Sequence, residues 1–152
     1  MIQTNVYNVH NGIDTAYIYI WISKKHAIIY IGMTNNSSGP IGRANGHFSS
    51  RGTFRKRFLE QKGIGVERVQ DMILLSFPLP KKRLYTSEES SYRESVEYLV
   101  QKELQLLRGQ LTPSYDIVSW HDRFPRRTSN AEVRRVAYDI VQKFQHNYNT
   151  LR

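Results

Sequence analysis

The sequence predicts an α+β domain, because it contains a pair of adjacent strands, a third strand and amphipathic helices. Residues 17–22 and 28–32 alternate in steps of two and are rich in β-branched and aromatic residues, which is typical of strands. The polar residues 23–26 between them predict a β-hairpin. A third strand is expected within residues 66–77, around the apolar run 72–75, and it ends at the prolines that follow.

The register of the hairpin follows from the position of its turn. A turn centred between Lys24 and Lys25 pairs Tyr19 with Tyr30. Alternation then places Tyr17, Tyr19, Trp21, Ile28, Tyr30 and Gly32 on one face, and Ile18, Ile20, Ile22, Ile29 and Ile31 on the other. We expect the isoleucine face to be the core face.

Helices are expected at residues 40–47, 53–61, 86–108 and 129–149. Pro40 suits a first helical turn, and Thr86-Ser87-Glu88-Glu89 has the hydroxyls and acids of a helix start. Ser129-Asn130-Ala131-Glu132 is a capping-box pattern that opens the C-terminal helix, whose apolar residues follow helical spacing. Residues 111–120 are expected to be irregular or to form a short strand.

The charge of the chain favours a polyanionic partner. Among 152 residues there are 22 Lys and Arg against 13 Asp and Glu, which gives a formal net charge of +9. The excess is clustered, with Arg51, Arg55, Lys56 and Arg57 in one block. Basic clusters of this kind bind phosphates, so nucleic acid is the expected partner. The alternative is a solvated basic surface without a specific role.

Several classes of protein and site are disfavoured. The chain has no cysteine, which excludes disulfides and thiol nucleophiles and fits a reducing, cytoplasmic compartment. No apolar run approaches the roughly 18 residues that span a bilayer, and residues 1–14 lack the apolar core of a signal peptide. The sequence also has no motif for a phosphate-binding loop, a serine elbow or a paired-histidine zinc site.

One acidic residue stands out on the helix expected at 86–108. On a helical wheel at roughly 100° per residue, Glu103 falls inside the apolar arc around Val96, whereas Glu97 lies at its edge. A carboxylate among apolar neighbours must be paired, protonated or bound to a cation, because burying it bare is costly. A salt bridge to an arginine and a metal site both remain open, and Glu103 is the acid to follow.

A set of short motifs occurs in one order along the chain. Tyr17-Ile18-Tyr19 is followed by Tyr30-Ile31-Gly32, by Arg43 and His47, and by Glu103 ahead of Leu106-Leu107 and Pro113-Ser114-Tyr115-Asp116. This order, over residues 17–116, resembles the GIY-YIG nuclease family, in which Gly-Ile-Tyr, Tyr-Ile-Gly, an Arg-x-x-x-His helix and a metal-binding glutamate follow one another. Tyr17 replaces the first glycine of the family, Asp116 replaces a frequent asparagine, and the spacing leaves Glu97 as the reserve candidate for the glutamate.

The resemblance implies a small three-stranded antiparallel sheet flanked by helices, here with an added C-terminal amphipathic helix. It also implies hydrolysis of phosphodiester bonds with one divalent metal, Mg²⁺ or Mn²⁺. Glu103 would hold the metal, and Arg43 would neutralise charge on the phosphate. Tyr19 would position or deprotonate the attacking water, helped by Tyr30 and His47. A purely structural aromatic pair is the alternative for the two tyrosines.

We therefore expect a stand-alone endonuclease that cuts DNA and has no membrane partner. Its single domain would span residues 1–152, with a catalytic core over 17–116 and a C-terminal helix over 129–149. The expected nucleic-acid contacts are Arg51, Arg55, Lys56 and Arg57. By analogy alone, the compact size favours a restriction-type or mobile-element nuclease. The alternatives are a non-catalytic nucleic-acid-binding module and an RNA-directed nuclease. The C-terminal helix either closes the core, which we favour, or forms a homodimer interface.

Overall fold

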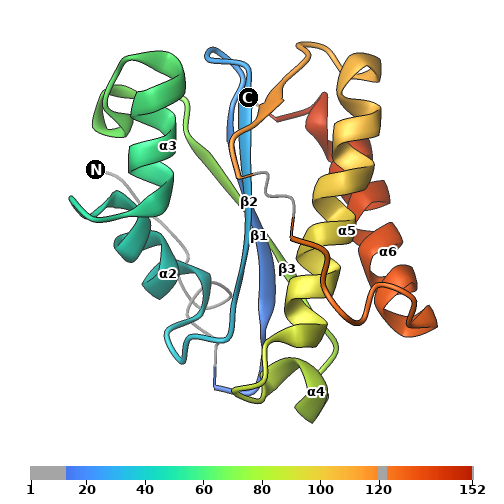
Figure 1. The fold of residues 1–152 in the computed structure, drawn as a ribbon. Helices are drawn as coiled ribbons and strands as arrows, with labels where there is room; N and C mark the ends of the chain where they lie inside the picture. The colour runs from blue at the N-terminus through green and yellow to red at the C-terminus, as the bar shows by residue number, and fades with distance from the viewer. Residues whose placement is uncertain (1–12, 120–122, 152) are drawn as a thin grey trace.

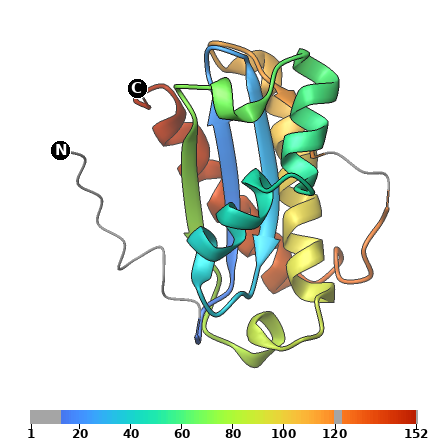
Figure 2. The ribbon, with the colours of Figure 1, turned by 90° about the vertical axis from the view of Figure 1, so that its left-hand side faces the viewer.

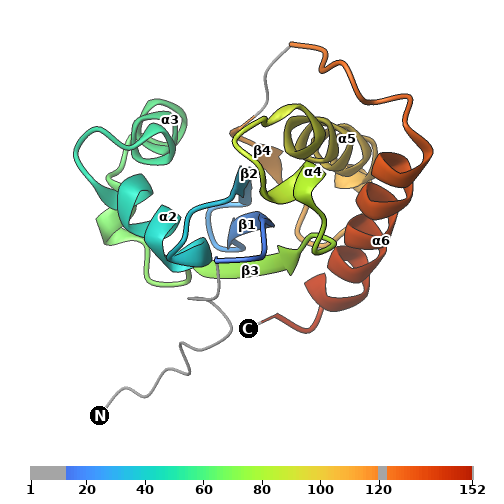
Figure 3. The same cartoon turned by 90° about the horizontal axis from the view of Figure 1, so that it is seen from below.

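The computed structural model describes residues 13–119 and 123–151, in which a mixed sheet is covered by helices on both faces (Figures 1 and 3). Helices α2 (Gly39–Phe48) and α3 (Thr53–Lys62) cover one face. Helices α5 (Ser91–Leu107) and α6 (Ala131–Tyr148) cover the other. The α+β class expected from the sequence is confirmed. Residues 1–12 and 152 of the expected domain, and residue 120 of the segment 111–120, lie outside the described residues.

The sheet has four strands in the order β3-β1-β2-β4. The strands are β1 (Tyr17–Ser23), β2 (Ile28–Thr34), β3 (Ile73–Pro78) and β4 (Asp116–Ile117). β1 is antiparallel to both of its neighbours, whereas β4 is parallel to β2, so the expectation of three antiparallel strands is wrong. The short strand that residues 111–120 allowed is β4, held by backbone hydrogen bonds from Asp116 to Ala27 and from Val118 to Ile29, each 2.9 Å long. Its parallel pairing with β2 was not predicted, because two residues carry no alternation that would assign a partner.

The hairpin forms as expected, but its register differs by two residues. Tyr19 pairs with Gly32, and Trp21 pairs with Tyr30, so the expected pairing of Tyr19 with Tyr30 is wrong. The cause is the turn, which is closed by a 3.1 Å hydrogen bond from the Ala27 N–H to the Lys24 carbonyl. Ala27 adopts a positive φ of 52°, which allows a longer loop than the one assumed. A shift of two residues leaves every side chain on its expected face.

Both faces of the hairpin are buried, each in its own apolar cluster. The isoleucine face packs with Val96, Val100 and Leu104 of α5 and with the apolar residues of α6. The opposite face carries a second cluster, made of Tyr19, Trp21, Ile28, Tyr30, Ala44, Phe54, Phe58, Val66 and Val118. The expectation of one core face was therefore incomplete. The second cluster forms because α2 and α3 lie over that face (Figure 3).

Helix α5 begins at Ser91, later than the expected start near residue 86. The preceding residues form the short helix α4 (Arg83–Thr86), and Ser87 is extended with ψ of 167°. The buried Arg93 guanidinium stabilises this break, because it donates 2.6 Å hydrogen bonds to the carbonyls of Tyr85 and Ser87. Short 3₁₀ turns at Val66–Arg68 and Arg108–Gln110 complete the described elements.

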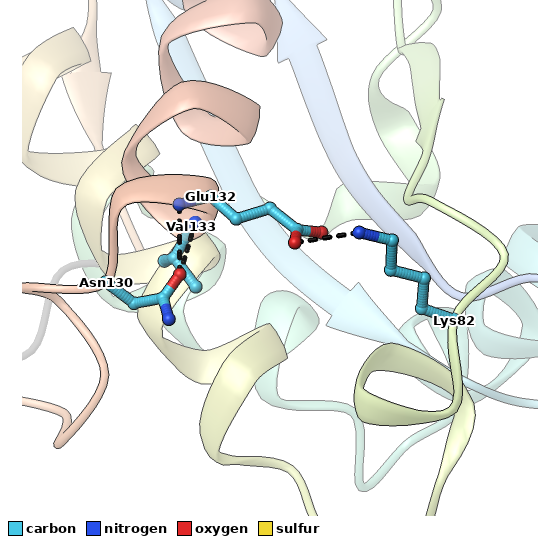
Figure 4. A network of polar contacts seen from close by, with 4 residues as sticks. All are labelled: Lys82, Asn130, Glu132 and Val133. Atoms are coloured by element: carbon cyan, nitrogen blue, oxygen red, sulfur yellow. Dashed lines mark hydrogen bonds and ion pairs between the residues drawn. The ribbon is translucent and has the colours of Figure 1, made fainter.

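Helix α6 starts at an asparagine cap (Figure 4). The Asn130 side-chain oxygen accepts hydrogen bonds from the N–H groups of Glu132 (3.0 Å) and Val133 (3.1 Å). The Glu132 carboxylate does not close a reciprocal capping box but forms a 2.8 Å ion pair with Lys82. The apolar face of α6 packs on α5 and in the cluster under the isoleucine face. The preferred expectation, that this helix closes the core, is confirmed.

Replacing Asn130 with alanine is expected to lower the free energy of unfolding by about 1 kcal/mol. The substitution leaves two backbone N–H groups at the helix start without an acceptor, and capping substitutions of this kind cost about 0.5–2 kcal/mol. Lys82→Met, which removes only the partly exposed ion pair with Glu132, should cost less than about 1 kcal/mol. Urea titration of both variants measures the two effects. An equal loss in both variants would contradict the capping role.

Candidate active site

Two buried phenols lie on the sheet face that α2 and α3 cover. Tyr19 of β1 is 2% exposed, and Tyr30 of β2 is similarly buried. The ring of Tyr19 crosses its pairing partner Gly32, where a Cβ atom would overlap the Tyr19 hydroxyl. Glycine is therefore required at position 32 for Tyr19 to take up this position. The requirement explains the glycine of the Tyr30-Ile31-Gly32 motif by packing alone.

His47, near the end of α2, lies against both phenols. Its Nε2 atom is 2.5 Å from the Tyr19 hydroxyl, within a short hydrogen bond. Its ring centroid is 5.0 Å from that of Tyr30, in an edge-to-face arrangement. Burial, and to a smaller extent the charge of Arg43, lowers the pKa of His47 to about 4. The imidazole is therefore neutral at physiological pH, and a neutral ring can hold the phenol through a hydrogen bond.

Arg43 lies one helical turn before His47 on the same side of α2. A hydrogen bond with Tyr19 raises the pKa of the Arg43 guanidinium above its ordinary value, so it remains charged. Burial raises the pKa of Tyr19, and the hydrogen bond with Arg43 opposes that increase. Because Arg43 is solvent-exposed, it can contact a ligand while it also holds the phenol. Tyr19 thus lies between a neutral base and a permanent cation.

Glu97 lies on α5, which contacts β2 and runs beside that strand (Figure 2). Its charge acts on Tyr19, Tyr30 and Arg43, so the carboxylate lies near these three side chains. Burial, and then the negative charge of Glu94, raises the pKa of the Glu97 carboxyl to about 7, although Arg43 and Arg57 oppose the shift. Glu97 is therefore a partly buried carboxylate whose burial outweighs the attraction of two nearby arginines.

The structure does not bring Glu103 to this group, which corrects the expectation from the helical wheel. Glu103 is exposed and lies in a surface pocket with Arg134 and Tyr138 of α6. The wheel failed because Leu106, which helped to define the apolar arc, is 67% exposed. The buried side of α5 is centred closer to Val100 and Leu104, and this shift moves Glu97 inward and Glu103 out.

A polar network that the sequence analysis missed holds the Glu97 side chain. The amide nitrogen of Gln101 donates to Glu97 Oε1 at 3.1 Å and lies 3.4 Å from the Ser119 hydroxyl. That hydroxyl accepts a 2.9 Å hydrogen bond from the Ile31 N–H of β2. Asp116 instead points to solvent, where it pairs with Lys62 at 3.7 Å. The spacing of four residues between Glu97 and Gln101 was the signal that could have revealed the first contact.

The basic residues expected to bind nucleic acid divide into different environments. Arg57 is close enough to lower the pKa of both Tyr30 and Glu97, and it donates a 3.3 Å hydrogen bond to the Val118 carbonyl. Arg51 and Lys56 are exposed. Arg55 forms a 3.0 Å ion pair with Glu67, so its charge is partly neutralised. Arg57 thus lies close to the phenols, whereas Arg51 and Lys56 lie on the solvent-facing side of α3 and of the residues just before it.

The metal chemistry of the site rests on one carboxylate. Within residues 13–119 and 123–151, no group of three or more His, Cys, Asp or Glu side chains could hold a metal ion together. Mg²⁺ commonly uses only one or two protein carboxylates and completes its coordination with water and phosphate oxygens. The Glu97 carboxylate fits such an ion, because its hydrogen bond with the Gln101 amide engages Oε1 and leaves Oε2 for a cation.

The pKa shifts of Glu97 and His47 predict opposing effects of pH on stability. Between pH 4.5 and 7 the folded protein holds a Glu97 proton that the unfolded chain has lost, so stability falls as pH rises. Between pH 4 and 6.5 the unfolded chain binds a His47 proton that the folded protein does not, so stability rises. Each effect is on the order of 3 kcal/mol, and they largely cancel.

Glu97→Gln should therefore unmask the His47 contribution. The variant is expected to gain stability between pH 4 and 6.5 and to exceed the wild type at pH 8 by on the order of 3 kcal/mol, because no charged carboxylate is buried. Urea unfolding at several pH values with EDTA present checks this. Parallel stability curves for the two proteins would contradict the shifted Glu97 pKa.

Comparison with known proteins adds one result. The family model described as GIY-YIG catalytic domain matches residues 15–108, which include Tyr19, Tyr30, Arg43, His47 and Glu97. No curated protein and no solved structure gives a significant match. In the part of the chain that the structure describes, every helix is too short or too polar to cross a bilayer.

Proposed function

The chain belongs to the GIY-YIG catalytic domain family, whose members are endonucleases, and from this we propose that it hydrolyses phosphodiester bonds of DNA with one divalent metal ion. The observation that carries the proposal is the 2.5 Å hydrogen bond between Tyr19 and His47, flanked by the Arg43 cation and the Glu97 carboxylate. A proton acceptor, a permanent positive charge and an oxygen ligand for a metal are the groups that attack on an anionic phosphate requires.

In the proposed reaction Tyr19 activates water with the help of His47. The neutral imidazole orients the phenol through the hydrogen bond at Nε2, Tyr19 loses its proton to solvent beside the Arg43 cation, and the resulting phenolate oxygen takes a proton from the attacking water. The water oxygen forms a bond to phosphorus, and the bond from phosphorus to the leaving sugar oxygen breaks. That oxygen then takes up a proton from solvent. Because burial raises the pKa of Tyr19, the phenol depends on the hydrogen bond and the charge of Arg43 to release its proton.

Arg43 and Glu97 act on the phosphate in different ways. Arg43 donates to the non-bridging phosphate oxygens through its planar group and offsets their growing charge. Glu97 would hold the divalent ion, which would supply positive charge that offsets the charge developing on the phosphate. Arg51, Lys56 and Arg57, on α3 and just before it, are proposed to contact the flanking DNA backbone. A basic layer beside the phenols agrees with the net charge of +9.

Incubation with supercoiled plasmid tests the proposal. The protein is expected to nick or linearise the plasmid with Mg²⁺ or Mn²⁺, and to leave it intact with EDTA. An RNA of matching sequence, incubated in parallel, should be cut far more slowly. Tyr19→Phe purified in the same way controls for contaminating nucleases. Binding without cleavage under every metal would favour a non-catalytic module, and cleavage of RNA alone would favour an RNA-directed enzyme.

A further inference from the structure

We infer that Gln101 and Ser119 are positioning residues that fix the Glu97 carboxylate so that one of its oxygens is free for a divalent cation. The inference rests on the proposed function and adds to it the side chains that hold the proposed metal ligand in place. Gln101 follows Glu97 by one helical turn on α5 and is fully buried. Its amide nitrogen donates to Oε1 of Glu97, so that oxygen is occupied and Oε2 is the one left for an ion.

The network connects the carboxylate to the sheet. Gln101 also lies 3.4 Å from the hydroxyl of Ser119, and that hydroxyl accepts the Ile31 N–H at 2.9 Å. Ile31 is the neighbour of Tyr30 in β2. The position of Glu97 is thereby coupled through two side chains to the strand that carries Tyr30. Groups that orient a metal ligand in this way commonly change metal affinity by about 10–100-fold when they are lost.

The energetics of Gln101 argue against a purely structural role. The Oε1 atom of Gln101 is buried and has no hydrogen-bond partner among the described residues. An unpaired buried acceptor destabilises the folded state, so an apolar side chain of similar size would pack at this position at least as well. The amide is therefore unfavourable for folding, and its useful contact is the one to Glu97. Ser119 is equally buried, in the segment that follows β4.

Titration of Mn²⁺ into the DNA-free protein, followed by electron paramagnetic resonance, tests the inference. Gln101→Leu is expected to raise the Kd for Mn²⁺ about tenfold or more while its melting temperature equals or exceeds that of the wild type. Ser119→Ala should weaken binding, and Ser119→Thr, which keeps the hydroxyl, should restore it. If Gln101→Leu fails to fold, the comparison of Ser119→Ala with Ser119→Thr tests the positioning role instead. Glu97→Gln provides the reference for complete loss of the ligand.

The outcomes separate this inference from the proposed function. Mn²⁺ binding that needs Glu97 but is unchanged in Gln101→Leu and Ser119→Ala would overturn the positioning role alone. Binding that survives in Glu97→Gln would overturn the proposed metal ligand and this inference together. A fall in melting temperature without any change in Kd would show that Gln101 and Ser119 serve the fold only.

Discussion

Glu97→Gln is expected to lower the rate of plasmid cleavage by about a thousandfold or more at saturating Mg²⁺. The change removes the negative charge proposed to hold the ion, and loss of the stabilisation that an ion gives to a transition state amounts to several kcal/mol. Each 1.4 kcal/mol corresponds to about a factor of ten in rate. The rate measured under single-turnover conditions gives the effect on the chemical step.

Glu103→Gln is the matched control for this prediction. It makes the same chemical change on the same helix, but at an exposed position beside α6 rather than beside the phenols. Its cleavage rate and its dependence on Mg²⁺ should stay within about twofold of the wild type, as expected of a surface substitution away from the site. If Glu103→Gln abolished cleavage and Glu97→Gln did not, the assignment of the metal ligand to Glu97 would be wrong.

Tyr19→Phe is expected to reduce the cleavage rate by about a hundredfold to a thousandfold and to leave DNA affinity nearly unchanged. General acid–base groups commonly contribute about 10²–10⁴-fold, and the substitution removes only the hydroxyl that contacts His47. The ring keeps its packing against His47 and across Gly32, so the fold should survive. Single-turnover cleavage and equilibrium DNA binding, measured with Ca²⁺ in place of Mg²⁺, separate the two effects.

Tyr115→Phe serves as the control for loss of a buried phenol. The Tyr115 hydroxyl donates a 3.0 Å hydrogen bond to the Leu104 carbonyl in the cluster on the other side of the sheet. Its loss should lower stability by about 1 kcal/mol without slowing cleavage. A Tyr19→Phe enzyme that cuts DNA at the wild-type rate would show that the Tyr19 hydroxyl is not part of the chemistry and that its ring serves only packing.

The hairpin and the C-terminal helix could be predicted from the sequence, because each has a strong pattern over many residues. Alternation identified both faces of the hairpin, and helical spacing identified α6. The exact pairing of Tyr19 with Gly32 could not be predicted, since it depends on the positive φ of Ala27 in the turn. An alanine at position 27 does not predict a positive φ, because positive φ values favour glycine, asparagine and aspartate.

The candidate site was predicted in part. Short-range motifs identified Tyr19, Tyr30, Arg43 and His47, and the structure places these side chains together. The choice of Glu103 over Glu97 was wrong, because it depends on which side of α5 faces the sheet and not on the composition of the helix. The helical wheel counted the exposed Leu106 as part of the apolar face, because a sequence does not distinguish an exposed leucine from a buried one.

The two apolar clusters on either side of the sheet have a consequence for the newly synthesised chain. The phenols, Arg43 and His47 belong to the layer of α2 and α3, whereas Glu97 arrives on α5, which also packs in the opposite cluster. If the proposed roles hold, a chain in which one of these layers has not docked lacks part of the site. Without α5 the phenols have no metal ligand, and without α2 the metal ligand has no Arg43 and no His47. Such a state is expected to be inactive, so the proposed cleavage requires both layers to be docked on the sheet.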